Sequence, residues 1–195
     1  WEKQWLVSIS ILYLKKKNLL KEAGRGGNRM VRIGVLALQG SFREHLNNLK
    51  EIPGVKEIAI KEKTELEKID GLILPGGEST TMKKLLDNFN LKEKIIELAN
   101  KGIPIWGTCA GLILMANKVK GEKSYLNLLD ITVKRNGYGG QLNSFNTKAV
   151  LPEVSQKKIP LVFIRAPYIS KTGDKVDILH QIDNKITAVR QNNLI

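Results

Sequence analysis

Apolar and polar residues follow one another in regular blocks along most of the chain, and these blocks predict its secondary structure. Short continuous apolar runs are typical of buried strands, whereas apolar residues three or four positions apart are typical of helices. From Met30 onward, the predicted strands cover residues 31–38, 55–61, 71–74 and 103–106. The predicted helices cover residues 41–52, 64–69, 79–89, 91–100 and 112–119. Near-continuous apolar strands that alternate with helices predict an α/β fold, in which a parallel sheet carries helices on both faces.

The pattern changes after Gly121, where short strands follow one another without clear helices between them. They are predicted at residues 131–134, 148–151, 161–164, 176–180 and 186–190. We expect some of these strands to be antiparallel, so the second half of the chain should differ in topology from the first.

Residues 1–29 do not share either pattern. A short apolar run at residues 5–13 is followed by three consecutive lysines and a glycine-rich stretch. A secretory signal carries its positive charges before its apolar core, and this run is shorter than the ~20 residues that cross a bilayer. We therefore expect residues 1–29 to be an extension that is disordered or not native to the protein. Residues 30–195 should form one domain with no membrane association.

The net charge of +13 raises the question of nucleic-acid binding. Residues 1–29 contain seven of the 32 basic residues and two of the 19 acidic ones, so they supply +5 of this charge. The other lysines are interleaved with acids, and no stripe of aromatic and basic residues could stack bases. A solvated, mildly basic surface is therefore favoured over a nucleic-acid-binding module. A single cysteine excludes a disulfide framework and a cysteine-cluster zinc site, and it favours a cytoplasmic location.

The most informative motif is Gly107-Thr108-Cys109-Ala110-Gly111, which contains the only cysteine. It follows an apolar strand and precedes a helix, which makes it the thiol counterpart of the nucleophile elbow. The positive end of that helix would favour the reactive thiolate of Cys109. The alternative, a buried structural cysteine, is disfavoured by this context. We therefore predict that Cys109 is a nucleophile.

A second motif, Pro75-Gly76-Gly77-Glu78-Ser79-Thr80-Thr81, follows another apolar strand and leads into a helix. Backbone N–H groups in such a loop are free of side chains and could bind an oxyanion. A tight turn capped by Ser79 is the alternative. A general base for Cys109 is harder to find, because His45 lies in the first predicted helix and His180 ends a late strand. Both histidines are interpreted as surface or interface residues.

Six motifs, including these two, occur in order along the chain. They are Ala37-Leu38-Gln39-Gly40, Arg43-Glu44-His45, Leu74-Pro75-Gly76-Gly77-Glu78-Ser79-Thr80-Thr81, Gly107-Thr108-Cys109-Ala110-Gly111, Arg135-Asn136 and Phe163-Ile164-Arg165-Ala166-Pro167. From Met30 to Ile195 the sequence resembles the glutaminase subunits of pyridoxal 5′-phosphate synthase, the PdxT/SNO family of class I (triad) glutamine amidotransferases. The resemblance implies a three-layer, flavodoxin-like fold with a mostly parallel open sheet.

The resemblance also implies an activity, the hydrolysis of L-glutamine to glutamate and ammonia without a metal or a cofactor. Cys109 would form a thioester with the substrate, and the backbone N–H groups of Gly77 and Ala110 would bind the oxyanion. Guanidinium groups suit the α-carboxylate of glutamine, because their fork geometry pairs with it bidentately. The implied glutamine-pocket residues are Gly77, Glu78, Ser79, Arg135, Ile164 and Arg165.

A partner follows from the same resemblance. The ammonia would pass to a (β/α)8-barrel synthase subunit that makes pyridoxal 5′-phosphate. Docking to that subunit would make the glutaminase competent. The implied interface residues are Gln39, Gly40, Arg43, Glu44 and His45.

The sequence departs from the family in two places. Residues 137–140 read Gly-Tyr-Gly-Gly where many relatives have Ser-Phe-Gly-Arg. The family's Phe-His-Pro-Glu motif, which supplies the histidine and glutamate of the triad, would lie beyond Ile195. We therefore expect a domain truncated at its C-terminus and a chain that is inactive or nearly so. A catalytically dead subunit that retains synthase docking is the alternative.

Overall fold

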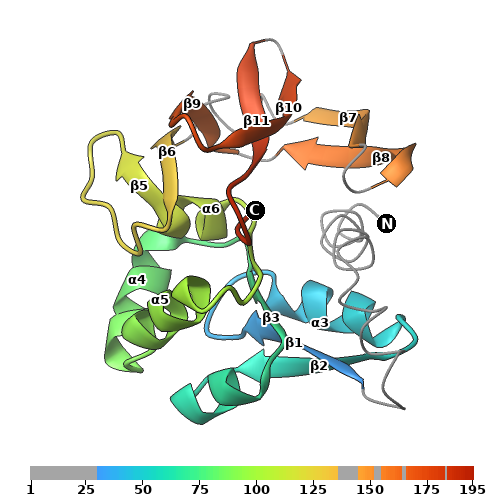
Figure 1. Cartoon of the computed structure of the whole chain (residues 1–195), viewed down its shortest axis with the longest axis vertical. Helices are drawn as coiled ribbons and strands as arrows, with labels where there is room; N and C mark the ends of the chain where they lie inside the picture. The colour runs from blue at the N-terminus through green and yellow to red at the C-terminus, as the bar shows by residue number, and fades with distance from the viewer. Residues whose placement is uncertain (1–29, 136–144, 152–154, 164–165, 183) are drawn as a thin grey trace.

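The computed structural model describes residues 30–135, 145–151, 155–163, 166–182 and 184–195. Four parallel strands form its first sheet in the order β2-β1-β3-β4. These strands are β1 (Val31–Leu36), β2 (Val55–Ile60), β3 (Gly71–Leu74) and β4 (Ile105–Gly107). The chain returns to this sheet at its end. The backbone N–H of Ile105 donates to the carbonyl of Asn193 at 3.1 Å, and the N–H of Ile195 donates to the carbonyl of Ile105 at 3.0 Å. Figure 1 shows this last segment descending from the upper part of the molecule into its centre.

Helices cover both faces of the first sheet, as the alternation of apolar runs predicts. On one face lies α3 (Phe42–Lys50), whose Leu49 packs with Ile33, Val35 and Ile73. The other face is covered by four helical elements, which share a larger apolar core with Leu72 and Leu74. They are η1 (Lys63–Lys68), a 3-10 helix, and the α-helices α4 (Ser79–Asn88), α5 (Lys92–Asn100) and α6 (Ala110–Met115). The predicted three-layer α/β architecture is therefore confirmed (Figure 1).

The second half of the chain forms a mixed sheet in the order β10-β11-β9-β6-β5. Its strands are β5 (Ala116–Val119), β6 (Leu129–Lys134), β9 (Tyr168–Thr172), β10 (Asp177–Ile182) and β11 (Lys185–Arg190). Only the β5–β6 pair is parallel among the strand pairs described in this sheet. A separate antiparallel hairpin consists of β7 (Phe145–Leu151) and β8 (Ser155–Phe163). The predicted antiparallel strands are thus confirmed.

The structure corrects two sequence predictions. The helix predicted at residues 112–119 ends at Met115, and the following Ala116–Val119 forms β5. The backbone N–H groups of Leu126 and Leu128 bind the carbonyls of Leu114 and Met115 at 3.0 and 2.9 Å, so the end of the helix is satisfied by a loop. Strand β9 was not predicted at all. Residues 1–29 lie outside the described part, so their predicted disorder stays a prediction. In the described part, no helix is long and apolar enough to cross a membrane.

The site residues lie at one edge of the first sheet. The carboxyl ends of parallel strands all point to the same edge, and in open α/β sheets this edge carries the ligand site. Here the segments that follow β1, β3 and β4 are residues 37–41, 75–78 and 108–109. These three segments contain most of the residues singled out by the sequence motifs.

Candidate active site

Cys109 occupies a strained turn between β4 and α6. Its backbone has φ 50° and ψ −100°, a conformation that non-glycine residues rarely adopt. Such strain is typical of nucleophile elbows, where it exposes the reactive side chain at the top of the sheet. The turn needs glycine at Gly111, because a Cβ atom there would lie only 2.1 Å from the backbone oxygen of Leu74. The predicted elbow is therefore present.

The glycine loop after β3 lies directly beside Cys109. A Cβ atom built on Gly76 would be 3.5 Å from the Cβ atom of Cys109. The backbone N–H groups of Ala110 and Gly77 both lower the pKa of the Cys109 thiol, so they face its sulfur closely enough to stabilise negative charge there. The structure thus brings together the sulfur and the two amides that the sequence analysis associated with an oxyanion hole.

The protonation of Cys109 differs from the sequence prediction. Burial raises the pKa of the Cys109 thiol, and this effect outweighs the lowering by the amides of Ala110 and Gly77 and by the charge of Arg135. The helix behind Cys109 has only six residues, so its dipole is small. The prediction that the thiolate form of Cys109 is favoured is therefore wrong for this fold, because desolvation penalises a buried anion.

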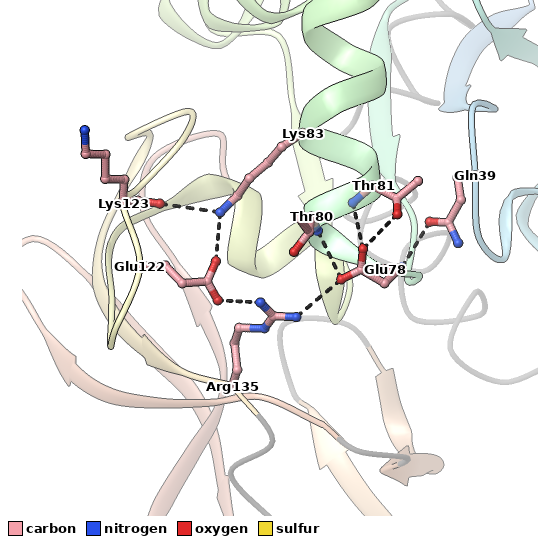
Figure 2. A network of polar contacts seen from close by, with 8 residues as sticks. All are labelled: Gln39, Glu78, Thr80, Thr81, Lys83, Glu122, Lys123 and Arg135. Carbon is pink, nitrogen blue, oxygen red and sulfur yellow. Dashed lines mark hydrogen bonds and ion pairs between the residues drawn. The ribbon is translucent and has the colours of Figure 1, made fainter.

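The segment after β1 holds the glycine loop in place. The backbone N–H and the hydroxyl of Ser41 both donate to the carbonyl oxygen of Gly76, at 3.0 and 3.3 Å. The side-chain oxygen of Gln39 accepts the backbone N–H of Glu78 at 3.0 Å (Figure 2). The loop that carries Gly77 is therefore fixed on both sides by residues 39–41.

Glu78, and not the Ser79 cap that the sequence offers as an alternative, caps helix α4. Its carboxylate accepts the backbone N–H groups of Thr80 and Thr81 at 3.2 and 2.7 Å, and the Thr81 hydroxyl at 2.9 Å (Figure 2). The backbone hydrogen bond from Thr81 is the largest cause that lowers the pKa of Glu78 to about 2. Ser79 is instead the first residue of α4, with a buried hydroxyl that has no hydrogen-bond partner in the described part of the chain.

Arg135 extends from the end of β6 toward the glycine loop. Its guanidinium pairs with Glu122 through Nη1 and with Glu78 through Nη2, the latter at 3.4 Å (Figure 2). Lys83 on α4 donates to Glu122 at 3.0 Å and completes this network. Arg135 and Glu78 are site residues that the sequence predicts, whereas Glu122 and Lys83 are not predicted by it. Their sequence neighbourhoods contain only ordinary charged residues, so no motif could have identified them.

The predicted interface residues differ in their exposure. Arg43 and Gly40 are exposed, whereas Gln39 and Glu44 are half-buried. His45 is buried, with only 2% of its surface exposed, although the sequence predicted a surface or interface side chain. The reason is helical spacing: His45 precedes the buried Leu49 by four residues and shares its sheet-facing side of α3.

The remaining predicted residues do not add to this site. Ile164, Arg165 and residues 137–140 lie outside the described residues. His180 lies on β10, where its Nδ1 atom is 2.7 Å from the Thr187 hydroxyl. Neither His180 nor His45 forms a hydrogen bond with Cys109 in the described structure, so neither can act as its general base in this arrangement.

These features define a class of protein. The chain has an α/β fold with a cysteine on a nucleophile elbow, two backbone amides beside the sulfur and a guanidinium at the rim. A sulfur nucleophile next to such amides suits acyl transfer, because they can stabilise the anion of a tetrahedral intermediate. The comparisons with known proteins make this class more specific.

The model of the SNO glutamine amidotransferase family matches residues 35–195. A pyridoxal 5′-phosphate synthase subunit PdxT from Ruminiclostridium cellulolyticum is 50% identical over 167 residues, which cover 85% of this chain and 88% of that protein. A PdxT subunit from Thermoanaerobacter sp. (strain X514) is 52% identical over 166 residues, with 85% and 88% coverage. A crystal structure of a glutamine amidotransferase superposes with a TM-score of 0.77 and 36% identity, covering 83% of this chain and 86% of that one. The chain belongs to the SNO glutamine amidotransferase family.

Proposed function

We propose that this protein binds L-glutamine and forms a thioester with it through Cys109. The sulfur attacks the carboxamide carbon, ammonia leaves, and water then releases glutamate from the thioester. The observation that carries this proposal is the strained turn of Cys109 directly beside the glycine loop, 3.5 Å from a Cβ atom built on Gly76, with the Gly77 and Ala110 amides lowering the pKa of its thiol. The same amides could bind the oxygen anion that forms when the sulfur attacks. Arg135 carries the positive charge that suits the α-carboxylate of glutamine.

The ammonia would serve the synthesis of pyridoxal 5′-phosphate. Relatives that share about half of this sequence are named as subunits of pyridoxal 5′-phosphate synthase. We propose a synthase subunit with a (β/α)8 barrel as the partner, docked against Gln39, Gly40, Arg43 and Glu44. Gln39 and Ser41 bind the glycine loop directly, so a partner on this segment could adjust the position of the Gly77 amide.

Residues 1–195 contain no histidine and glutamate that correspond to the Phe-His-Pro-Glu motif of the family. A buried thiol with a raised pKa needs a base for efficient attack, and the leaving ammonia needs a proton. We therefore propose that the 195 residues by themselves bind glutamine but hydrolyse it slowly or not at all.

Glutamate release in the presence of a synthase subunit from a PdxT-containing relative tests both proposals. Two chains are compared: residues 1–195, and the same chain extended by a family segment that carries Phe-His-Pro-Glu. We expect glutamate release from the extended chain, no release from its Cys109→Ser variant, and little release from residues 1–195. Equal release by the extended chain and its Cys109→Ser variant would exclude Cys109 as the nucleophile. Equal release by both chain lengths would show that no added base is needed.

A further inference from the structure

Arg135 is held between two carboxylates that differ in their surroundings. Its Nη1 group pairs with Glu122, while its Nη2 group reaches Glu78 at 3.4 Å. The Glu122 side chain is 25% exposed and the Glu78 side chain is 49% exposed. Ion pairs weaken as their exposure to water increases. The contact with Glu122 is therefore the stronger support of the guanidinium, and the contact with Glu78 is the weaker one.

Glu122 is itself tied to a rigid part of the fold. Lys83 on α4 donates to Glu122 at 3.0 Å and to the carbonyl of Lys123 at 3.4 Å (Figure 2). The backbone of Lys83 is in turn bound by the hydroxyl of Tyr125 at 3.2 Å. Burial alone would raise the pKa of Glu122, but Arg135 and Lys83 outweigh it and lower that pKa. Glu122 is therefore a charged bridge between α4 and the end of β6.

Glu78, in contrast, has other partners. Its carboxylate already accepts two backbone N–H groups and one hydroxyl at the start of α4. These contacts keep its charge satisfied when the Nη2 group of Arg135 changes partner. Nη2 can thus exchange one carboxylate for another without leaving Glu78 unpaired.

We propose that Glu122 is a positioning residue for substrate binding: it anchors Nη1 of Arg135 so that Nη2 can exchange Glu78 for the α-carboxylate of glutamine. The inference rests on the proposed function, because it needs glutamine as the ligand. A long arginine side chain loses rotamer freedom when it binds a ligand, and a side chain that is already held in place loses less. Glu122 would then increase the affinity for glutamine without touching it.

The test uses the protection of Cys109 by its ligand. Cys109 is the only cysteine, so its alkylation by iodoacetamide is read unambiguously from the mass of the intact chain. The half-protecting concentration of L-glutamine reports affinity and does not require turnover. Glu122→Gln keeps the shape of the side chain and removes its charge. We expect it to raise the half-protecting concentration about tenfold, as for the loss of one charge-assisted hydrogen bond.

Three further variants separate positioning from folding. Glu97→Gln is the matched control, because Glu97 on the distant helix α5 also pairs with two cations, Lys94 and Lys101. It should leave protection unchanged. Lys83→Met removes the cation that holds Glu122 and should raise the half-protecting concentration about threefold. This variant replaces Glu122→Gln as the test if Glu122→Gln folds poorly. In an Arg135→Lys background, which loses the fork geometry, Glu122→Gln should have little further effect.

The outcomes distinguish this inference from the proposed function. If L-glutamine protects the parent chain and Glu122→Gln equally well, the positioning role is overturned. The role is also overturned if the full effect of Glu122→Gln persists in the Arg135→Lys background. If L-glutamine fails to protect the parent chain at all, the proposed glutamine site is itself wrong. Each variant's protection is normalised to its own alkylation rate without glutamine, so that a change in the reactivity of the Cys109 thiol does not count as a change in affinity.

Discussion

Gly40→Ala tests whether the segment after β1 controls the active-site loop. Gly40 has φ +90°, and a Cβ atom there would lie 2.0 Å from the carbonyl oxygen of Gly76. Carbon and oxygen atoms that are not bonded approach to about 3.3 Å, so one of the two backbones must move by about 1 Å. Such a shift would break both hydrogen bonds from Ser41 to Gly76, which measure 3.0 and 3.3 Å.

The magnitude follows from these contacts. Each lost hydrogen bond costs about 1 kcal/mol, and a positive φ at alanine costs about 1–2 kcal/mol more. Gly54→Ala is a matched control, because Gly54 has φ +81° but nothing lies within 4 Å of its added Cβ atom. The two variants share the backbone strain and differ in the clash. Urea unfolding should therefore show Gly40→Ala to be less stable than Gly54→Ala by about 2 kcal/mol.

The same variant should also change Cys109. The Gly77 amide lowers the pKa of the Cys109 thiol, and Gly77 follows the displaced residue directly. The midpoint of iodoacetamide alkylation against pH should rise in Gly40→Ala and stay unchanged in Gly54→Ala. In the extended chain with a synthase subunit, the loss of this amide should reduce kcat by about 10²-fold or more. If the two variants match in stability and in alkylation midpoint, the coupling of Gly40 to the site is refuted.

Two further predictions concern pH. Burial lowers the pKa of His45 to about 4. The neutral form of His45 therefore stabilises the fold fully above pH 6.5. This contribution, about 3 kcal/mol, is lost as the pH falls toward 4. His45→Leu should flatten the decline of urea stability between pH 6.5 and 4, and an unchanged slope would contradict the burial of His45. Hydrogen bonds lower the pKa of Glu78 to about 2, so its cap stabilises α4 above pH 4.5 and is lost as the pH falls through 2. Glu78→Ala should cost about 1 kcal/mol at pH 7 and less at pH 2, and an equal cost at both values would show that the charge is irrelevant.

The sequence was sufficient where a local pattern determines the structure. Strand β3 has the predicted bounds because Gly71–Leu74 is a short apolar run between turn signals. The helix predicted at residues 112–119 was wrong because the apolar residues Ala116 and Val119 fit a helix or a strand equally well. Pairing with β6 decides in favour of a strand. Strand β9 was missed because Tyr168–Thr172 mixes polar and apolar residues and lacks a strong pattern.

In the candidate site, too, local sequence patterns predict some features, whereas others depend on contacts between distant parts of the chain. The glycines around Cys109 predict the elbow directly, because only residues without a side chain fit such close turns. The sequence could not reveal Glu122, since Lys83 and Arg135 lie 39 and 13 residues away along the chain. The direction of the Cys109 pKa was also missed. It depends on burial, which is a property of the folded chain and of no single motif.

The central claim is that Cys109 is the nucleophile of a glutamine site, and an affinity label shaped like glutamine tests it most directly. The chain is treated with 6-diazo-5-oxo-L-norleucine or its D-enantiomer, and the modified residue is identified by peptide mass spectrometry. We predict that the L-enantiomer modifies Cys109 much faster than the D-enantiomer and that L-glutamine prevents the modification. Equal rates for the two enantiomers, or modification that L-glutamine does not prevent, would contradict the claim.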